Sequence, residues 1–140
     1  MELYSTSSLE VKYDEGQGIL FMACFRKAGT EEFIAGFLQA LQYAEEHQVK
    51  RWLLDLRGIG SLNDQEESWL HTHLFPRIMM NLGTGNYVAM VLSEKCYQVL
   101  LKEAGKFGLQ SYNSFIILNN FCEVGEALHW LQQTAVPRAS

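Results

Sequence analysis

The chain has 140 residues, the length of one domain, and its 48% hydrophobic and 19% charged residues argue against a largely disordered protein. The formal net charge is −5, and the basic residues are scattered, with pairs such as Arg26-Lys27 as their longest groups. Because binding to a phosphate backbone needs clustered Lys and Arg, we expect no nucleic-acid partner.

The cysteines and the N-terminal segment indicate the cellular compartment of the protein. Cys24, Cys96 and Cys122 are far apart and form no CxxC motif, so they predict neither a zinc site nor a redox dithiol and fit a reducing compartment. The first ten residues lack the features of a signal peptide, and no apolar run approaches the ~20 residues of a membrane helix. We expect a cytoplasmic protein without a membrane span, one domain over 1–140 whose ends, 1–6 and 135–140, are flexible.

The first half of the chain predicts a hairpin followed by a helix and a strand. Residues 9–15, "LEVKYDE", alternate as in a half-exposed strand, and a turn at "EGQG" leads to a longer apolar strand over 17–27. Thr30 can cap a helix that ends near His47. The sequence "RWLLDL" over 51–56 then predicts a short buried strand.

The second half alternates helices and strands. Asn63 and Glu66 have capping-box spacing at the start of a helix over 63–81, which Pro76 should kink or split. The following elements are a strand over 86–92, a helix over 93–104, a strand over 114–118 and a final helix with a second capping-box spacing at Asn120 and Glu123. The predicted order is β-β-α-β-α-β-α-β-α, an α/β fold with a mostly parallel sheet and an N-terminal antiparallel hairpin.

Polar residues gather where the predicted parallel strands end, and ligands of open α/β sheets bind beyond such carboxyl ends. The candidate binding residues are Asp55, Arg57, Ser61, Asn63, Asp64, Ser93 and Lys95. Helix N-termini at the same edge would favour an anion. The alternative is that these residues are helix caps and solvated loop residues.

One face of the second predicted helix carries Asp64, Glu67 and His71, a set that could bind a metal or move a proton. The alternative is the solvated side of an amphipathic helix. No nucleophile or oxyanion arrangement accompanies these residues, and no serine, histidine and aspartate form a recognisable catalytic frame. We therefore predict no catalytic residue, metal or cofactor, and an enzyme using His71 is the weakest hypothesis.

At the exit of the strand over 51–56, Asp55, Leu56, Gly58 and Ile59 match the first half of the pattern D-L-S-G-V-x-x-x-D-S-S-G. In this the chain resembles the STAS family, the SpoIIAA-like fold of bacterial anti-sigma-factor antagonists, which carries a pattern close to this one. The element order also matches, and "WLHTHLFPRI" and "EALHWL" resemble a group of uncharacterised bacterial STAS-like proteins. In the second half of the pattern, Asp64 and Gln65 replace the two serines, one of which is the phosphorylation target in the antagonists.

The resemblance implies a regulatory or protein-interaction module in signal transduction that has lost the usual phosphoacceptor, because Ser61 and Ser68 are out of register. Its protein partner, or an anionic small molecule, would bind at the N-terminus of the second helix.

Two further hypotheses concern other partners. Lipid-transfer domains of the CRAL-TRIO type have a related winding, so the chain could carry a lipid or another small apolar or anionic ligand in a cleft at the Pro76 kink, beside Trp69 and Phe75. The alternative for these aromatic residues is core packing. A homodimer is also possible, because the N-terminal hairpin may leave an open sheet edge.

Overall fold

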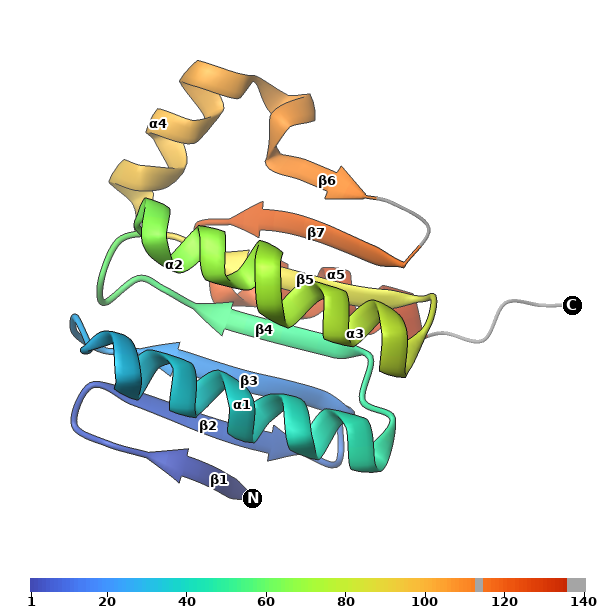
Figure 1. The fold of residues 1–140 in the computed structure, drawn as a ribbon. Coiled ribbons are helices and arrows are strands. Elements are labelled where there is room, and N and C mark those ends of the chain that lie inside the picture. The colour runs from blue at the N-terminus through green and yellow to red at the C-terminus, as the bar shows by residue number, and fades with distance from the viewer. Residues whose placement is uncertain (113–114, 136–140) are drawn as a thin grey trace, which may run out of the picture.

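The computed structural model describes residues 1–112 and 115–135, and Figure 1 shows one twisted sheet with helices on both faces. The sheet has seven strands in the order β1-β2-β3-β4-β5-β7-β6. The strands are β1 (Glu2–Ser5), β2 (Leu9–Asp14), β3 (Ile19–Cys24), β4 (Arg51–Asp55), β5 (Asn86–Val91), β6 (Gln110–Tyr112) and β7 (Ile116–Phe121). The helices are α1 (Thr30–His47), α2 (Asp64–Trp69), η1 (Leu70–Leu74), α3 (Phe75–Leu82), α4 (Glu94–Ala104), η2 (Lys106–Leu109) and α5 (Val124–Ala135).

The sheet is mixed, which confirms the predicted α/β class. β2 pairs antiparallel with β1 and β3, whereas β3, β4, β5 and β7 run parallel to one another. β6 adds a second antiparallel edge beside β7. The parallel strands are rich in apolar residues because helices cover both of their faces.

Two edge strands were not predicted. β1 covers residues 2–5, which the sequence analysis left outside the sheet, and the Tyr13 N–H donates to the Met1 carbonyl at 2.8 Å. β6 is only three residues long, too short to give an alternating pattern. A homodimer through the β1 edge stays a prediction. The C-terminal end, 135–140, was expected to be flexible, and residues 136–140 of it lie outside the described part of the chain.

The predicted cap at Asn120 is wrong. β7 continues through Asn120 to Phe121, because it keeps its register with β5, where Met90 lies opposite Asn120. The Asn120 side-chain amide donates to the Leu109 carbonyl at 2.9 Å instead of capping a helix. The final helix, α5, begins only at Val124.

Two apolar layers hold the helices to the sheet. Alternate residues of β4 point to opposite faces, so Trp52 and Leu54 join the larger core under α1 and α3, while Leu53 joins the smaller core under α5. In the smaller core, Ala127 and Leu131 are fully buried. No helix in the described part of the chain is long and apolar enough to cross a membrane.

The second helix is split, as Pro76 predicts. α2 is followed by the π-helical turn η1, in which the Phe75 N–H donates to the Leu70 carbonyl five residues earlier, and Pro76 lies in the first turn of α3. The π turn lets one nearly straight rod, visible in Figure 1, accommodate the proline.

Candidate functional site

The parallel strands β3, β4, β5 and β7 end at one edge of the sheet, where the predicted binding residues gather. They do not form one site. Asp55 holds Arg57 through two bonds, Arg57 Nε to Asp55 Oδ1 at 2.9 Å and Nη2 to Oδ2 at 2.8 Å, and the pKa of Arg57 is raised by these bonds. This pair borders a hollow on the α5 side of the sheet, with Leu53 and Val124.

Asn63 and Ser93 are helix caps. Asn63 Oδ1 accepts from the Glu66 N–H at 2.7 Å, and the Asn63 N–H donates to Glu66 Oε1 at 2.9 Å, which confirms the predicted capping box. Lys27 also reaches Glu66 Oε1, at 3.1 Å, so this buried carboxylate is already occupied. Ser93 Oγ accepts from the Cys96 N–H at 3.2 Å at the start of α4.

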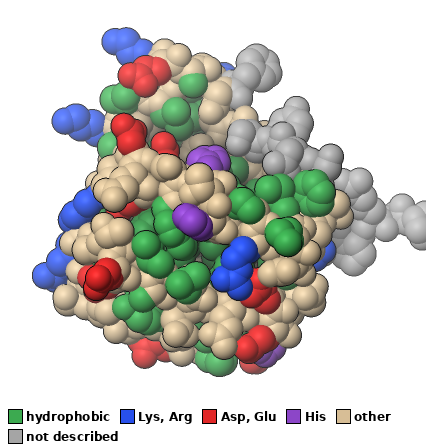
Figure 2. All heavy atoms as spheres, in the orientation of Figure 1, with side chains coloured by type: hydrophobic (Ala, Val, Ile, Leu, Met, Phe, Trp, Pro, Cys, Tyr) green, Lys and Arg blue, Asp and Glu red, His purple; other side chains and the backbone are tan. Residues whose placement is uncertain are grey.

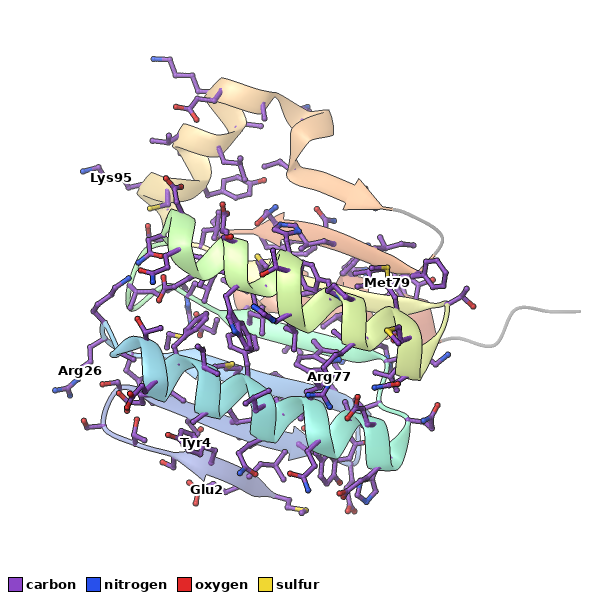
Figure 3. The ribbon with its side chains drawn as sticks, in the orientation of Figure 1. Glu2, Tyr4, Arg26, Arg77, Met79 and Lys95 are labelled. Atoms are coloured by element: carbon purple, nitrogen blue, oxygen red, sulfur yellow. The ribbon has the colours of Figure 1, made fainter. Side chains whose placement is uncertain are left out.

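The remaining candidates lie at different positions. Asp64 is exposed in the first turn of α2. Lys95 is exposed in the first turn of α4, and its side chain extends away from the body of the protein in Figure 3. Ser61 lines a cavity. Among the described residues, no group of three or more His, Cys, Asp or Glu is placed to hold a metal ion.

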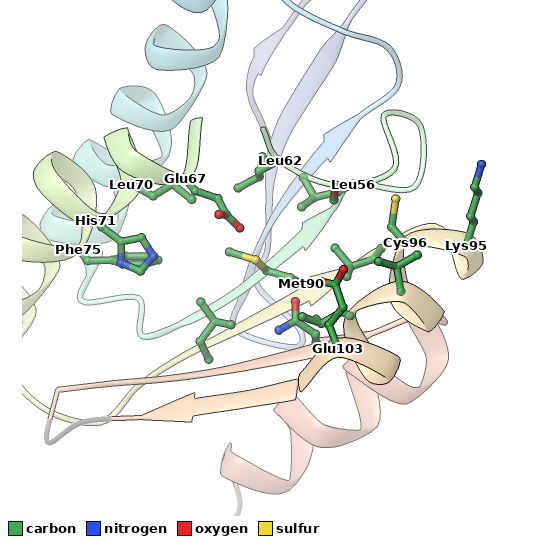
Figure 4. A pocket seen from close by; sticks show the side chains of 16 residues that line it. Leu56, Leu62, Glu67, Leu70, His71, Phe75, Met90, Lys95, Cys96 and Glu103 are labelled. Carbon is green, nitrogen blue, oxygen red and sulfur yellow. The ribbon is translucent and has the colours of Figure 1, made fainter. Parts of the chain in front are cut away.

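That cavity, of about 390 Å³, lies between the α2–η1 segment and α4 (Figure 4). Its apolar lining consists of Leu56, Leu62, Leu70, Phe75, Met90, Leu92, Cys96, Val99, Leu100 and Leu118. β4, β5 and β7 and the residues directly after them supply the floor, α2 and η1 supply one wall, and α4 supplies the other.

The cavity is open because α4 stands away from the sheet. None of the residues of α4 is buried, and Val99, which lines the cavity, is 49% exposed. The bond from the Ser93 N–H to the Gly60 carbonyl at 3.0 Å fixes the beginning of the helix, and the partly buried Cys96 and Leu100 pack against the larger core. The loop that follows β4 is therefore joined directly to the start of α4.

Polar groups border the same cavity. Glu67 and His71 line it from the second helix, and Glu103 lines it from α4. The His71 ring meets Phe75 edge-on, with 5.1 Å between ring centroids. Glu67 and His71 of the predicted helix face thus line the same cavity, whereas Asp64, the third residue of that face, does not.

Sequence analysis missed Glu103 as a lining residue. The signal was available, since Cys96, Val99 or Leu100, and Glu103 follow one another at helical spacing and so share one face of α4. The sequence analysis assigned no role to this face, and nothing in the pattern reveals that α4 is held away from the sheet.

A second groove, of about 370 Å³, runs between α1 and the η1–α3 segment, where Figure 2 shows hydrophobic side chains gathered at the surface. Leu38 and Trp69 line it. Trp69 also packs against Phe33 and Phe37, with ring centroids 6.2 and 5.9 Å apart. Trp69 therefore belongs to the core contacts of α1, as the alternative reading of these aromatic residues predicts.

Two of the thiols, those of Cys24 and Cys122, have raised pKa values. Burial, with the nearby Glu66 and Asp55 carboxylates, raises the pKa of Cys24 to about 12. Burial also raises the pKa of Cys122. A nucleophilic cysteine needs a lowered pKa, so neither residue has the environment of a catalytic thiol.

Comparisons of the chain with protein family models, curated proteins and solved structures find no match. The STAS resemblance therefore depends on the predicted order of elements, on the short match from Asp55 to Ile59 and on the segments "WLHTHLFPRI" and "EALHWL".

Proposed function

We propose that the protein is a STAS-like binding module that holds a small, largely apolar ligand in the cavity between α2–η1 and α4. The support is the cavity itself, because volumes of about 300–1,000 Å³ with mostly apolar walls and a few polar groups are typical of small-molecule sites. Its 390 Å³ lies at the small end of that range. This favours the ligand carrier over the other hypotheses, with the ligand beside Phe75, whereas Trp69 and Pro76 of the expected cleft line the groove between α1 and η1–α3.

The position of the cavity links a bound ligand to the loop that follows β4. Ser61 and Leu62 line the cavity and belong to the loop that carries the STAS-like residues Asp55 to Ile59 at its start. The same loop is bonded to α4 through Gly60 and Ser93. A ligand that draws α4 toward the sheet would therefore also bias the loop, which is how a regulatory module could report occupancy to a protein partner.

The test is the binding of an uncharged fluorescent probe, N-phenyl-1-naphthylamine, whose emission rises in apolar surroundings. We expect saturable binding to the wild type and its loss in Val99→Trp, because the larger ring fills the cavity. Met80→Trp is the matched control, since Met80 is an exposed helix residue that lines none of the three hollows described above. Equal binding by both variants, or no saturable binding by the wild type, would refute the proposal.

Docking of a protein partner at the start of α2 is the second candidate function. It is favoured by the exposure of Arg57, Asn63 and Asp64 around one loop at the carboxyl edge. Asp64→Lys should reduce capture of a partner from lysate of the native host. Glu46→Lys, an equal charge change on exposed α1, should leave capture intact. The same recovery with both variants would count against this docking site.

A further inference from the structure

We propose that the cavity selects a ligand with a cationic nitrogen, an amine carried on an apolar body. This inference rests on the proposed function and adds the chemical class of the ligand. Two carboxylates, those of Glu67 and Glu103, point into the cavity from opposite walls in Figure 4. Glu67 comes from α2 and Glu103 from α4, so the two approach one space from separate elements.

Neither carboxylate has a partner within the described part of the chain. The ion pairs found there join other residues, namely Glu10 with Lys12, Glu66 with Lys27, Asp55 with Arg57 and Glu45 with Arg77. No hydrogen bond from a described residue reaches the side chain of Glu67 or Glu103, whereas Asn120, another lining residue, is bonded to the Leu109 carbonyl. The two carboxylates are thus available to a ligand.

No cation of the described chain neutralises them inside the cavity. Among the described lining residues, Lys95 is the single Lys or Arg, and Figure 4 shows its side chain directed away from the cavity. His71 is the other basic lining residue, and its ring packs edge-on against Phe75. The charge facing the cavity is therefore negative, over a floor of leucine and methionine side chains.

An ammonium group suits this arrangement. Charge-assisted hydrogen bonds between ammonium and carboxylate are about twice as strong as neutral ones, and Glu67 and Glu103, both exposed, attract a cation most strongly at low ionic strength. The apolar body would lie on Met90 and Leu118, and the nitrogen would lie between Glu67 and Glu103. A carboxylate on the same body would meet two like charges and bind worst.

The experiment compares three eight-carbon probes that differ only in the head group: octylamine, octanol and octanoate. Each displaces N-phenyl-1-naphthylamine from the wild type at pH 7, below its micelle concentration. We expect octylamine to bind about two- to fivefold more tightly than octanol, the effect of an ion pair at exposed carboxylates, and octanoate to bind least.

The variant Glu67→Gln/Glu103→Gln should remove the preference for octylamine while octanol still binds. Glu46→Gln/Glu123→Gln, the same change of net charge at exposed positions that do not line the cavity, should keep the preference. If the first variant does not fold, the head-group order in the wild type and in the two single variants decides.

The outcomes separate the two proposals. Equal binding of the three probes, or tightest binding of octanoate, would overturn the selection of a cation and leave a cavity that binds apolar ligands. Failure of all three probes and of N-phenyl-1-naphthylamine would overturn the proposed function with it. A preference for octylamine that persists unchanged in Glu67→Gln/Glu103→Gln would place the cation elsewhere and also refute the inference.

Discussion

Gly58 should be the most sensitive position of the loop after β4, and Gly58→Ala should destabilise the protein by about 3 kcal/mol. A Cβ at this position would lie 2.4 Å from the Cys24 carbonyl oxygen and 2.5 Å from that of Phe25, distances that Cβ atoms essentially never show. Both oxygens are backbone atoms, so no side-chain rotation relieves the clash. The loop after β3 is also held, because the Phe25 N–H donates to the Ser8 carbonyl at 2.7 Å.

The magnitude follows from overpacking, which typically costs 1–3 kcal/mol, with the upper part of the range expected when rigid backbone must move. In a domain of this size, about 3 kcal/mol corresponds to a fall in Tm of about 10 °C. Urea titration followed by circular dichroism gives the free energy of unfolding. Gly125→Ala is the control, because nothing lies within 4 Å of its Cβ position. A Gly58→Ala protein within about 0.5 kcal/mol of the wild type would refute the close approach of the two loops.

Three other predictions concern the capping box, a buried thiol and the smaller core. Asn63→Ala should lower the free energy of unfolding by about 1 kcal/mol in urea titration, and Asn63→Ser should restore most of it, because serine also caps. The pKa of Cys24 is raised from an ordinary 9.0 to about 12 by burial, so the unfolded state loses this proton first. The free energy of unfolding should therefore fall from pH 9 toward pH 12, and it should fall less in Cys24→Ala. The same fall in Cys24→Ala as in the wild type would contradict this prediction. Leu131→Ala should cost about 3 kcal/mol in the same titration, because Leu131 is fully buried against the sheet, whereas Leu38→Ala should cost under ~0.5 kcal/mol.

Local sequence signals predicted most of the fold. The alternation in β2 and the apolar runs of β3, β4 and β5 reflect burial on one or both faces of a sheet, which is a property of the segment itself. The capping box at Asn63 was equally local and was confirmed. The edge strand β1 was missed because its pairing depends on β2 and not on its own pattern.

The candidate site was predicted only in part. Caps and binding residues use the same polar residue types, so the sequence could not separate the capping Asn63 and Ser93 from Ser61, which lines the cavity. The face that carries Glu67 and His71 was found because helical spacing is local. Its counterpart Glu103 lies 36 residues from Glu67 along the chain, and their approach depends on how α4 is placed over the sheet.

The placement of α4 is where local and global preferences disagree. Its sequence has the apolar spacing of a helix that covers a sheet, yet Val99 is 49% exposed and no residue of the helix is buried. Leu56, Met90 and Leu92 on the facing side are almost fully buried, so the exposed apolar surface belongs mainly to α4. Departures from consistent patterning concentrate at functional sites in natural proteins. A ligand that fills the space would cover Val99 and Leu100 and recover the burial that the free protein lacks. Hydrogen exchange should then show α4 amides becoming more protected when the probe binds, with α1 unchanged, and equal protection of both helices would contradict a site beneath α4.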